Sequence, residues 1–502
     1  MNEKKMSAYS TLEKRFRRMN ALTEASGVLG WDMSTVMPSG GAEARMEQLA
    51  VLSGVCHEIL TGAEVGELFD KAVEAKGELN GWQLANLREM QRIWRHATAL
   101  EGDFVEAKIK ACKRCEMVWR SARPEGDFAA VLPTLKEVLN LTQQEARVKS
   151  EIFGCNSYDA LLDHYEPGGK SARIDAIFDD FSSFFPDFLQ NVLDKQATRS
   201  KPVMPDGPFP VAVQEKLGRE MVQAVGFDFN HGRLDVSLHP FCGGVPDDVR
   251  ITTRYDEADF MISLMGVLHE TGHAMYERNL PPDWRLQPVG AARGMTMHES
   301  QSLIIEMQAS RSPEFISYMA GKAQHAFGAS GTAWSVDNMR GIYNQVQPDF
   351  IRVDADEVTY PAHVILRYRL EKELISGNMQ VEDLPQAWGD GLEGLLGIRP
   401  PNNRLGCLQD IHWYDGAWGY FPTYTLGAMA AAQLFEAAKK ANPEIPQALT
   451  RGDFSPLMSW LNVNVHNWGS FLSTDELLTR VTGHPLDPQI FKKHLKARYL
   501  DS

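Results

Sequence analysis

One pentapeptide, His269-Glu270-Thr271-Gly272-His273, constrains this chain of 502 residues more than any other feature. On an α-helix, residues four apart lie on the same face, one turn above each other. Two imidazoles placed in this way can bind one Zn²⁺ at about 2.0–2.1 Å. Glu270 lies beside them, where a carboxylate can accept a proton from water activated by the metal. The pentapeptide therefore predicts a helix that carries a metal site, the alternative being a chance match with two core or surface histidines.

The flanking sequence supplies the helix that this pentapeptide needs. Acidic residues between positions 256 and 259 place negative charge where a helix N-terminus favours it. Apolar residues recur at helical spacing over residues 260–268. Asn279, followed by Pro281 and Pro282, predicts the end of the helix.

A third ligand is required, because a catalytic zinc usually has three protein ligands and one open position. A second predicted helix begins near Met295 and carries Glu299, with Glu306 two turns further along the same face. Glu299 is the preferred ligand, and Glu306 and His298 are alternatives. The spacing Thr296-x-x-Glu299 also fits a capping box, in which the carboxylate would bind the backbone instead of a metal.

Composition and charge narrow the functional classes. The formal net charge is -15, which argues against a nucleic-acid partner. The charged N-terminal segment lacks the apolar core of a signal peptide, and the longest apolar-rich run is far short of the about 20 residues that span a bilayer. We therefore expect a cytoplasmic protein with no membrane partner.

The six cysteines are scattered along the chain. Cys112 and Cys115 form a C-x-x-C within a predicted helix, and both are expected to be reduced thiols.

Hydrophobic periodicity predicts a mainly helical chain with a few short strands. Helices are expected over residues 10–28, 42–60, 64–123, 128–153 and 175–198, with a break at 30–38. Proline-rich residues 200–211 predict a linker or lobe boundary. Period-two alternation predicts strands at 233–238, 249–255 and 350–354, with a glycine turn at 243–247. Such strands, beside the predicted metal helix, indicate a small sheet that edges an active-site cleft and can hold an extended peptide.

Six motifs, in order, resemble those of the M32 family of metallocarboxypeptidases, the thermostable carboxypeptidase Taq group. They are His239-Pro240-Phe241, Asp248-Val249-Arg250-Ile251-Thr252, His269-Glu270-Thr271-Gly272-His273, His298-Glu299-Ser300-Gln301, Ile351-Arg352-Val353-Asp354-Ala355-Asp356 and Gly406-Cys407-Leu408-Gln409-Asp410-Ile411-His412-Trp413. The resemblance covers nearly the whole chain and implies that Glu299 is the third zinc ligand, with His269 and His273.

The resemblance also implies the architecture. It points to a mainly α-helical, two-lobed peptidase like neurolysin and angiotensin-converting enzyme, with a deep groove, a small β-sheet near the active site and a homodimeric assembly. We expect one domain over residues 1–502, with an N-terminal helical portion (1–199), a zinc-site portion (200–430) and C-terminal helices (431–502).

The function implied is a zinc-dependent carboxypeptidase that hydrolyses the C-terminal peptide bond of peptides with a free C-terminus, Glu270 acting as general base. Co²⁺ is compatible with the same ligands. Tyr424 is the first choice to stabilise the oxyanion, with Tyr420 nearby, although a buried structural tyrosine fits the same pattern.

Recognition of the substrate's terminal carboxylate is expected from a guanidinium, which binds it through two hydrogen bonds. The resemblance points to Arg352, for which an ion pair with Asp354, Asp356 or Glu357 is the alternative. Arg250, Gln409 and His412 are expected to line the closed end of the groove, and His239 is expected close to the site with no assigned role. For each of the four, contact with substrate and a structural role behind the contacting residues are both open.

Two other functions compete with this one. The first is a zinc oligopeptidase that cuts internally or releases dipeptides with the same metal and base. The second is a catalytically silent helical scaffold that binds a partner in its groove, and the intact set of metal-site residues argues against it.

Overall fold

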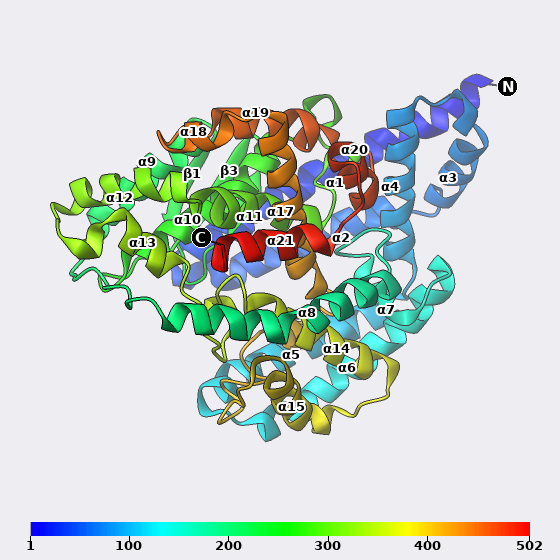
Figure 1. The fold of residues 1–502 in the computed structure, drawn as a ribbon. Coiled ribbons are helices and arrows are strands. Elements are labelled where there is room, and N and C mark those ends of the chain that lie inside the picture. Colours follow the sequence, from blue (N-terminus) through cyan, green and yellow to red (C-terminus); the bar gives the residue numbers. More distant parts are fainter. Residues whose placement is uncertain (1, 502) are drawn as a thin grey trace.

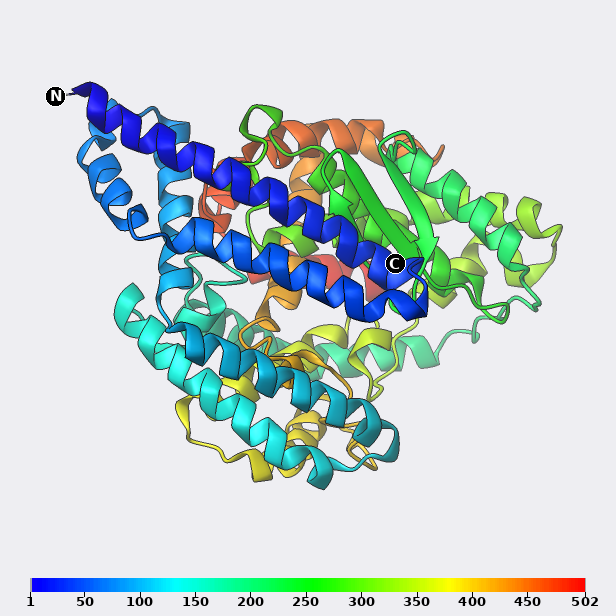
Figure 2. The same cartoon turned by 180° about the vertical axis from the view of Figure 1, so that it is seen from behind.

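The N-terminal helices form a long layer on one side of the molecule (Figure 2). The computed structural model describes residues 2–501. This layer comprises α1 (Asn2–Thr35), α2 (Ala42–Thr61), α3 (Val65–Glu74) and α4 (Gly81–Thr98). The predicted break at 30–38 is placed too early, because α1 continues to Thr35. Trp31 is buried there, with the guanidinium groups of Arg233 and Arg250 at 4.9 Å and 4.6 Å from its ring. This packing against the sheet holds the last turns of α1 helical despite Gly30.

A lower lobe combines helices from two distant parts of the chain (Figure 1). Its members are α5 (Gly102–Glu125), α6 (Phe128–Phe153), α7 (Ser157–Leu162), α8 (Ser171–Ala197), α14 (Tyr360–Ser376) and α15 (Leu384–Leu396). The predicted single stretch over 64–123 is in fact α3, α4 and α5. α3 ends at Glu74, and Asn80 begins α4, since its side chain accepts a hydrogen bond from the Gln83 amide in a capping box.

The central portion of the chain carries the sheet and the pentapeptide. It contains α9 (Val211–Val225), β1 (Gly232–Val236), β2 (Cys242–Val245), β3 (Asp248–Thr253), α10 (Phe260–Arg278), α11 (Met295–Leu303), a π-helical segment (Ile304–Ser310), α12 (Pro313–Phe327) and α13 (Val336–Tyr343). The strand order is β1-β3-β2, with β3 parallel to β1 and antiparallel to β2.

One turn prediction and one strand prediction are wrong. The expected turn at 243–247 is largely β2, the edge strand, in which Gly244 adopts a positive φ of 80° where an added Cβ would lie 2.2 Å from the Asp248 carbonyl oxygen. The expected strand at 350–354 is a single 3₁₀ turn, Arg352–Asp354. Its backbone is held by side chains instead of a neighbouring strand, because the Arg352 amide donates to Gln409 Oε1 at 2.9 Å.

The C-terminal helices complete the core around the pentapeptide. They are α16 (His412–Asp415), α17 (Pro422–Ala441), α18 (Ile445–Leu449), α19 (Ser455–Asn464), α20 (Thr474–Thr482) and α21 (Pro488–Tyr499). Figure 1 shows α10, α11 and α17 at the centre of the molecule, with α21 crossing in front. The mainly helical fold with a small sheet is thus confirmed. Within residues 2–501, no single helix has both the length and the apolar composition of a membrane span, and one bent pair, 39–61 with 65–74, passes that test jointly.

Close approach of α10 to α11 depends on a glycine inside the pentapeptide. A Cβ added to Gly272 would lie 2.4 Å from the Gln301 carbonyl oxygen and 2.6 Å from Ser302 Cα, both backbone atoms of α11. Gly427 on α17 has the same function, since its Cβ would lie 2.7 Å from Glu299 Cβ. These two glycines bring the helices that carry the site into contact.

Gly272→Ala is therefore expected to destabilise the protein by about 1–3 kcal/mol, because it overpacks the contact between α10 and α11. Gly266, on the same helix, is the matched control, as no atom lies within 4 Å of its added Cβ. Gly266→Ala should be neutral or stabilising by up to about 1 kcal/mol, from helix propensity alone. The measurement is the melting temperature of each variant. Equal melting temperatures would show that the contact between α10 and α11 has room for a methyl group at position 272.

Candidate metal centre and substrate groove

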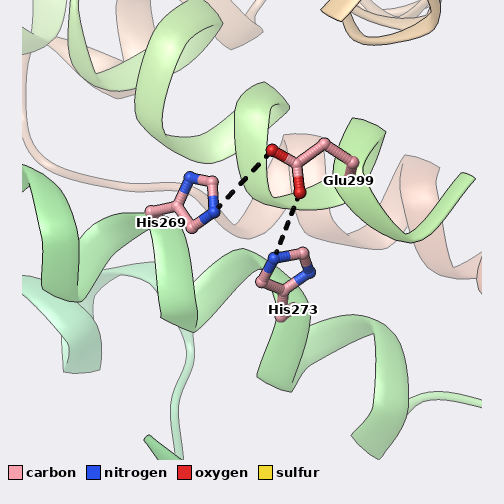
Figure 3. Close-up of side chains that lie close together, drawn as sticks. All are labelled: His269, His273 and Glu299. Atoms are coloured by element: carbon pink, nitrogen blue, oxygen red, sulfur yellow. Dashed lines mark ion pairs between the residues drawn. The ribbon is translucent and has the colours of Figure 1, made fainter. Parts of the chain in front are cut away.

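Three side chains from two helices converge at the centre of the molecule (Figure 3). α10 presents His269 and His273 four residues apart, and α11 presents Glu299 opposite them. His269 Nε2 lies 4.0 Å from Glu299 Oε1, and His273 Nε2 lies 3.6 Å from Glu299 Oε2. One donor atom from each of the three side chains lies within 4.8 Å of the others. This is a spacing from which all three can reach one ion between them.

Local interactions fix the helices that present these side chains. Asp259 begins α10, its Oδ1 accepting a hydrogen bond from the Met261 amide at 2.8 Å. The first amides of α11 are bound by a distant loop, since Met295 N donates to the Tyr165 carbonyl at 2.7 Å and Thr296 N to Glu166 Oε2 at 3.2 Å. The capping box predicted as an alternative for Glu299 does not form, because Thr296 lies inside the helix that Gly294 precedes. The Glu299 carboxylate therefore faces the histidines.

Glu306 orients His269 from the side opposite Glu299. Its Oε2 lies 3.0 Å from His269 Nδ1, and its Oε1 accepts from Arg311 Nη2 at 2.6 Å. The π-helical segment that carries Glu306 follows α11 directly, as such segments often do at functional sites. Because Nδ1 donates to Glu306, Nε2 is the ring nitrogen of His269 that a metal would take, in place of a proton. This geometry places Glu306 behind the ligand and not beside it.

His298, the other alternative ligand, lies behind His273 as Glu306 lies behind His269. His298 Nδ1 lies 2.6 Å from His273 Nδ1, and His298 Nε2 lies 2.8 Å from Glu277 Oε1. The carboxylate accepts from Nε2–H of His298, so the Nδ1 of His298 accepts from Nδ1–H of His273. Nε2 of His273 is then unprotonated and directed towards Glu299. His273 is thus held in the tautomer that a metal ligand requires, and His269 directs the corresponding nitrogen, Nε2, towards Glu299.

The charges of the site suit a divalent cation. Burial, followed by the neighbouring imidazoles His298 and His269, holds the pKa of His273 well below its usual value, so that ring is neutral. Burial opposes protonation of His269, but the hydrogen bond to Glu306 and the charges of Glu299 and Glu270 raise its pKa to about 10. A position among these carboxylates therefore attracts positive charge, and two imidazoles with one carboxylate form a common donor set for catalytic zinc. The residues present fit a divalent metal.

Glu270 lies in the same cavity as the three converging side chains. This groove has a volume of about 960 Å³ and is bordered by the 241–242 edge of β2, by α10 and α11, and by the segment 352–357. Burial, more than the neighbouring charges, raises the pKa of Glu270 to about 7. A carboxyl group of that pKa can take up and release a proton near neutral pH.

Arg352 lies at the groove and is paired with a residue that the sequence did not single out as its partner. Its Nη2 and Nε lie 2.8 Å and 3.1 Å from Asp410 Oδ1, and its Nη1 donates to the Tyr360 hydroxyl at 3.0 Å. The predicted alternative of an ion pair with Asp354, Asp356 or Glu357 is wrong. Asp356 accepts from Val358 and Thr359 at the start of α14, and Glu357 pairs with Arg498 and His494 of α21.

Two tyrosines line the groove with Arg352: Tyr424 in the first turn of α17 and Tyr420 just before that helix. The Tyr424 ring centre lies 4.7 Å from the Arg352 guanidinium carbon, and the Tyr420 and Tyr424 rings meet edge to face at 5.1 Å. The Tyr424 hydroxyl is 3.1 Å from His412 Nε2. Burial raises the pKa of Tyr424 well above its usual value, so its phenol stays protonated and can donate a hydrogen bond.

The other predicted substrate-binding residues lie outside this cavity. Arg250 packs over the Trp31 ring of α1, and its Nε donates to Asp248 at 3.0 Å. His239 is exposed, and its carbonyl accepts from Ser237 Oγ. Gln409 is buried and braces a loop, since its Nε2 donates to the Phe350, Leu405 and Gly406 carbonyls. His412 reaches the groove only through Tyr424.

Several residues that shape the site went unassigned from sequence. They are Glu277, Arg311, Tyr360, Arg367 and Asp410. For Asp410 a signal existed, because it is the one acidic residue of the motif that contains Gln409 and His412. Glu277 and Arg367 carry no such signal, because their partners His298 and Asp410 lie 21 and 43 residues away in sequence. Arg311 and Tyr360 contact residues only five and eight positions away, but no motif marks them.

Comparison with known proteins agrees with this geometry. Residues 11–499 match the family described as Carboxypeptidase Taq (M32) metallopeptidase. The chain belongs to the M32 carboxypeptidases. The resemblance drawn from its six motifs is confirmed, and membership of this family of metal-dependent peptide hydrolases implies a divalent metal.

Individual M32 relatives cover almost the whole chain. Thermostable carboxypeptidase 1 of Thermus thermophilus is 34% identical over 505 residues, or 98% of each chain. Carboxypeptidase 1 of Bacillus subtilis is 33% identical over 97% of this chain and 98% of its own. The structure of Trypanosoma cruzi metallocarboxypeptidase 1 is 41% identical and superimposes with a TM-score of 0.97, covering 99% of this chain and 100% of that chain.

Substitution can distinguish the roles of the two carboxylates, Glu299 and Glu306, at the metal centre of this M32 carboxypeptidase. Glu299→Ala should lose most of its bound metal after dialysis, because it removes a donor atom. Glu306→Ala should retain metal with an affinity about 10–100-fold lower, since it only orients His269. Metal content and chelator competition give the two results. Loss of metal from Glu306→Ala with retention in Glu299→Ala would reverse the assignment.

Proposed function

We propose that this M32 carboxypeptidase removes C-terminal residues from peptides, with His269, His273 and Glu299 as metal ligands and Glu270 as general base. The observation that carries the proposal is the position of Arg352. A buried guanidinium lines the same cavity as the metal donors and Glu270, so the groove bears a group suited to a terminal carboxylate. A peptide whose last residue lies between them has its final peptide bond at the metal.

The chain's own residues have distinct roles in this proposal. A divalent metal, when bound, supplies a Lewis acid and an activated water. Glu270 accepts a proton from the attacking water and transfers it to the leaving amine. Tyr424 donates a hydrogen bond to the oxygen that becomes negative, with Tyr420 packed against its ring. Arg352 orients the substrate through its carboxylate.

Zinc is the metal we propose, because two imidazoles and one carboxylate are a usual zinc set, and Co²⁺ accepts the same donors. A homodimer is proposed from the family resemblance alone. A cytoplasmic location is proposed from the few, scattered cysteines, which fit a reducing compartment. For Arg250, His239, Gln409 and His412 we propose supporting roles around the groove instead of direct contact with substrate.

Product analysis distinguishes this function from an oligopeptidase. Metal-stripped protein is reconstituted with Zn²⁺ or Co²⁺ and incubated with a peptide of about ten residues, and the products are followed by mass spectrometry. We expect loss of single residues in succession from the C-terminus. Dipeptides or internal fragments as first products would favour the oligopeptidase, and no product with either metal would favour the silent scaffold.

A further inference from the structure

Asp410 lies between two arginines, each of which binds a different oxygen of its carboxylate. Arg352 takes Oδ1, through Nη2 at 2.8 Å and Nε at 3.1 Å. Arg367, from α14, takes Oδ2, through Nε at 2.7 Å and Nη2 at 2.6 Å. The remaining nitrogen of Arg367, Nη1, donates to the His363 carbonyl at 2.7 Å. The carboxylate is therefore held rigidly from both sides.

The charges of this cluster do not balance. Burial opposes ionisation of Asp410, but the two guanidinium groups hold its pKa far below the usual range, so it is negative. Burial lowers the pKa of Arg367 only to about 10, so it is positive at neutral pH. The nearby imidazoles are neutral, because burial lowers the pKa of His363 to about 3 and that of His412 to about 4. The buried carboxyl of Glu371 also interacts with Arg367, but burial raises its pKa to about 7, so it is only partly ionised at neutral pH. Two cations therefore share Asp410 as their one full anion, and the cluster keeps a net positive charge.

That surplus charge is available only through Arg352. Arg367 is 0% exposed and its guanidinium packs over Trp388 at 4.4 Å, so it cannot touch a peptide. Arg352 borders the groove, and its Nη1 is not engaged by Asp410. Without Arg367, the Arg352–Asp410 pair would be neutral overall, and repulsion from Asp410 would offset much of the attraction of an entering carboxylate to Arg352.

We propose that Arg367 is a positioning residue that compensates Asp410 and so leaves the charge of Arg352 free for the substrate's terminal carboxylate. This inference rests on the proposed function, and it adds Arg367 as a residue that acts on the substrate through Arg352. An uncompensated charge inside a protein is costly unless a partner arrives, and the terminal carboxylate of a peptide is the partner of matching charge and shape. A purely structural role for Arg367, joining α14 to the 405–412 loop, is the competing explanation.

The test compares two substitutions that differ in charge. Arg367→Gln keeps a donor for Asp410 Oδ2 and removes the charge, whereas Arg367→Lys keeps both. KM and kcat are measured for one peptide as the free acid and as the C-terminal amide, together with metal content and melting temperature. We expect Arg367→Gln to raise KM for the free acid by about 10- to 100-fold, the range for one unit charge at an effective dielectric constant near 20. KM for the amide, kcat and metal content should change little, and Arg367→Lys should resemble the wild type.

A double variant separates charge balance from structure. Arg367→Gln with Asp410→Asn removes one charge of each sign and restores the surplus, so the preference for the free acid should return. The double variant also lacks the buried Asp410 carboxylate, so it can be used for the test if Arg367→Gln alone does not fold. Equal losses on both substrates in Arg367→Gln, or a folded, metal-loaded double variant without the preference, would overturn the inference. A wild type that cuts both substrates equally would instead remove the proposed function itself.

Discussion

Glu270→Gln is expected to lower kcat by about 100- to 10,000-fold while the protein keeps its metal. Glu270 follows His269 in sequence, and its side chain lines the groove together with the metal donors. It is not one of the three converging donors. Glutamine has nearly the same shape but cannot take up the proton of the attacking water. Steady-state kinetics gives kcat, and metal analysis of the same preparation gives the metal content.

The control for this substitution is the metal content. Loss of metal together with activity would make Glu270 part of the metal site and leave its role as a base unsupported. Normal metal content with near-normal turnover would remove Glu270 from the mechanism.

Arg352→Ala is expected to impair cleavage of free-acid peptides by roughly 30- to several-thousand-fold in kcat/KM. The estimate follows from the loss of one charge-assisted, desolvated contact, about 2–5 kcal/mol. Amidated peptides, which lack the carboxylate, should be affected much less. Paired assays of the two peptides with wild type and variant measure the difference.

Arg352→Lys is the matched control for this second prediction. Lysine restores the charge but not the two-pronged donor geometry, so the rescue should be partial. Metal content should be normal in both variants, because Arg352 contacts Asp410 and Tyr360 and not the donors of the metal centre. An Arg352→Ala variant that loses activity equally on both peptides would show a structural role alone.

The metal centre could be predicted from the sequence because its determinants are local or contained in short motifs. His269 and His273 are brought together by one helical turn, whatever the rest of the fold does. The end of their helix near Asn279 follows from the prolines after it. Glu299 required the motif around it, since spacing alone also allowed Glu306, His298 or a capping role.

The features that were missed depend on contacts between distant segments. β2 contains two adjacent glycines and so resembled a turn, but Gly244 is needed because β3 passes too close for a side chain. Residues 350–354 alternate like a strand, yet they lie beside the loop of Gln409 and Asp410 and have no strand to pair with. The second arginine on Asp410 lies 43 residues away from it in sequence, on a helix of the lower lobe, and no local pattern marks it.

Peptide binding to an inactive, metal-loaded protein tests the central claim most directly, because it separates recognition from turnover. The Glu270→Gln variant is titrated calorimetrically with one peptide as the free acid and as the C-terminal amide. The free acid should bind at least about 30-fold more tightly, and adding Arg352→Ala should abolish the difference. Equal Kd values for the two peptides in Glu270→Gln would contradict the account, since they would show that the groove does not read the terminal carboxylate.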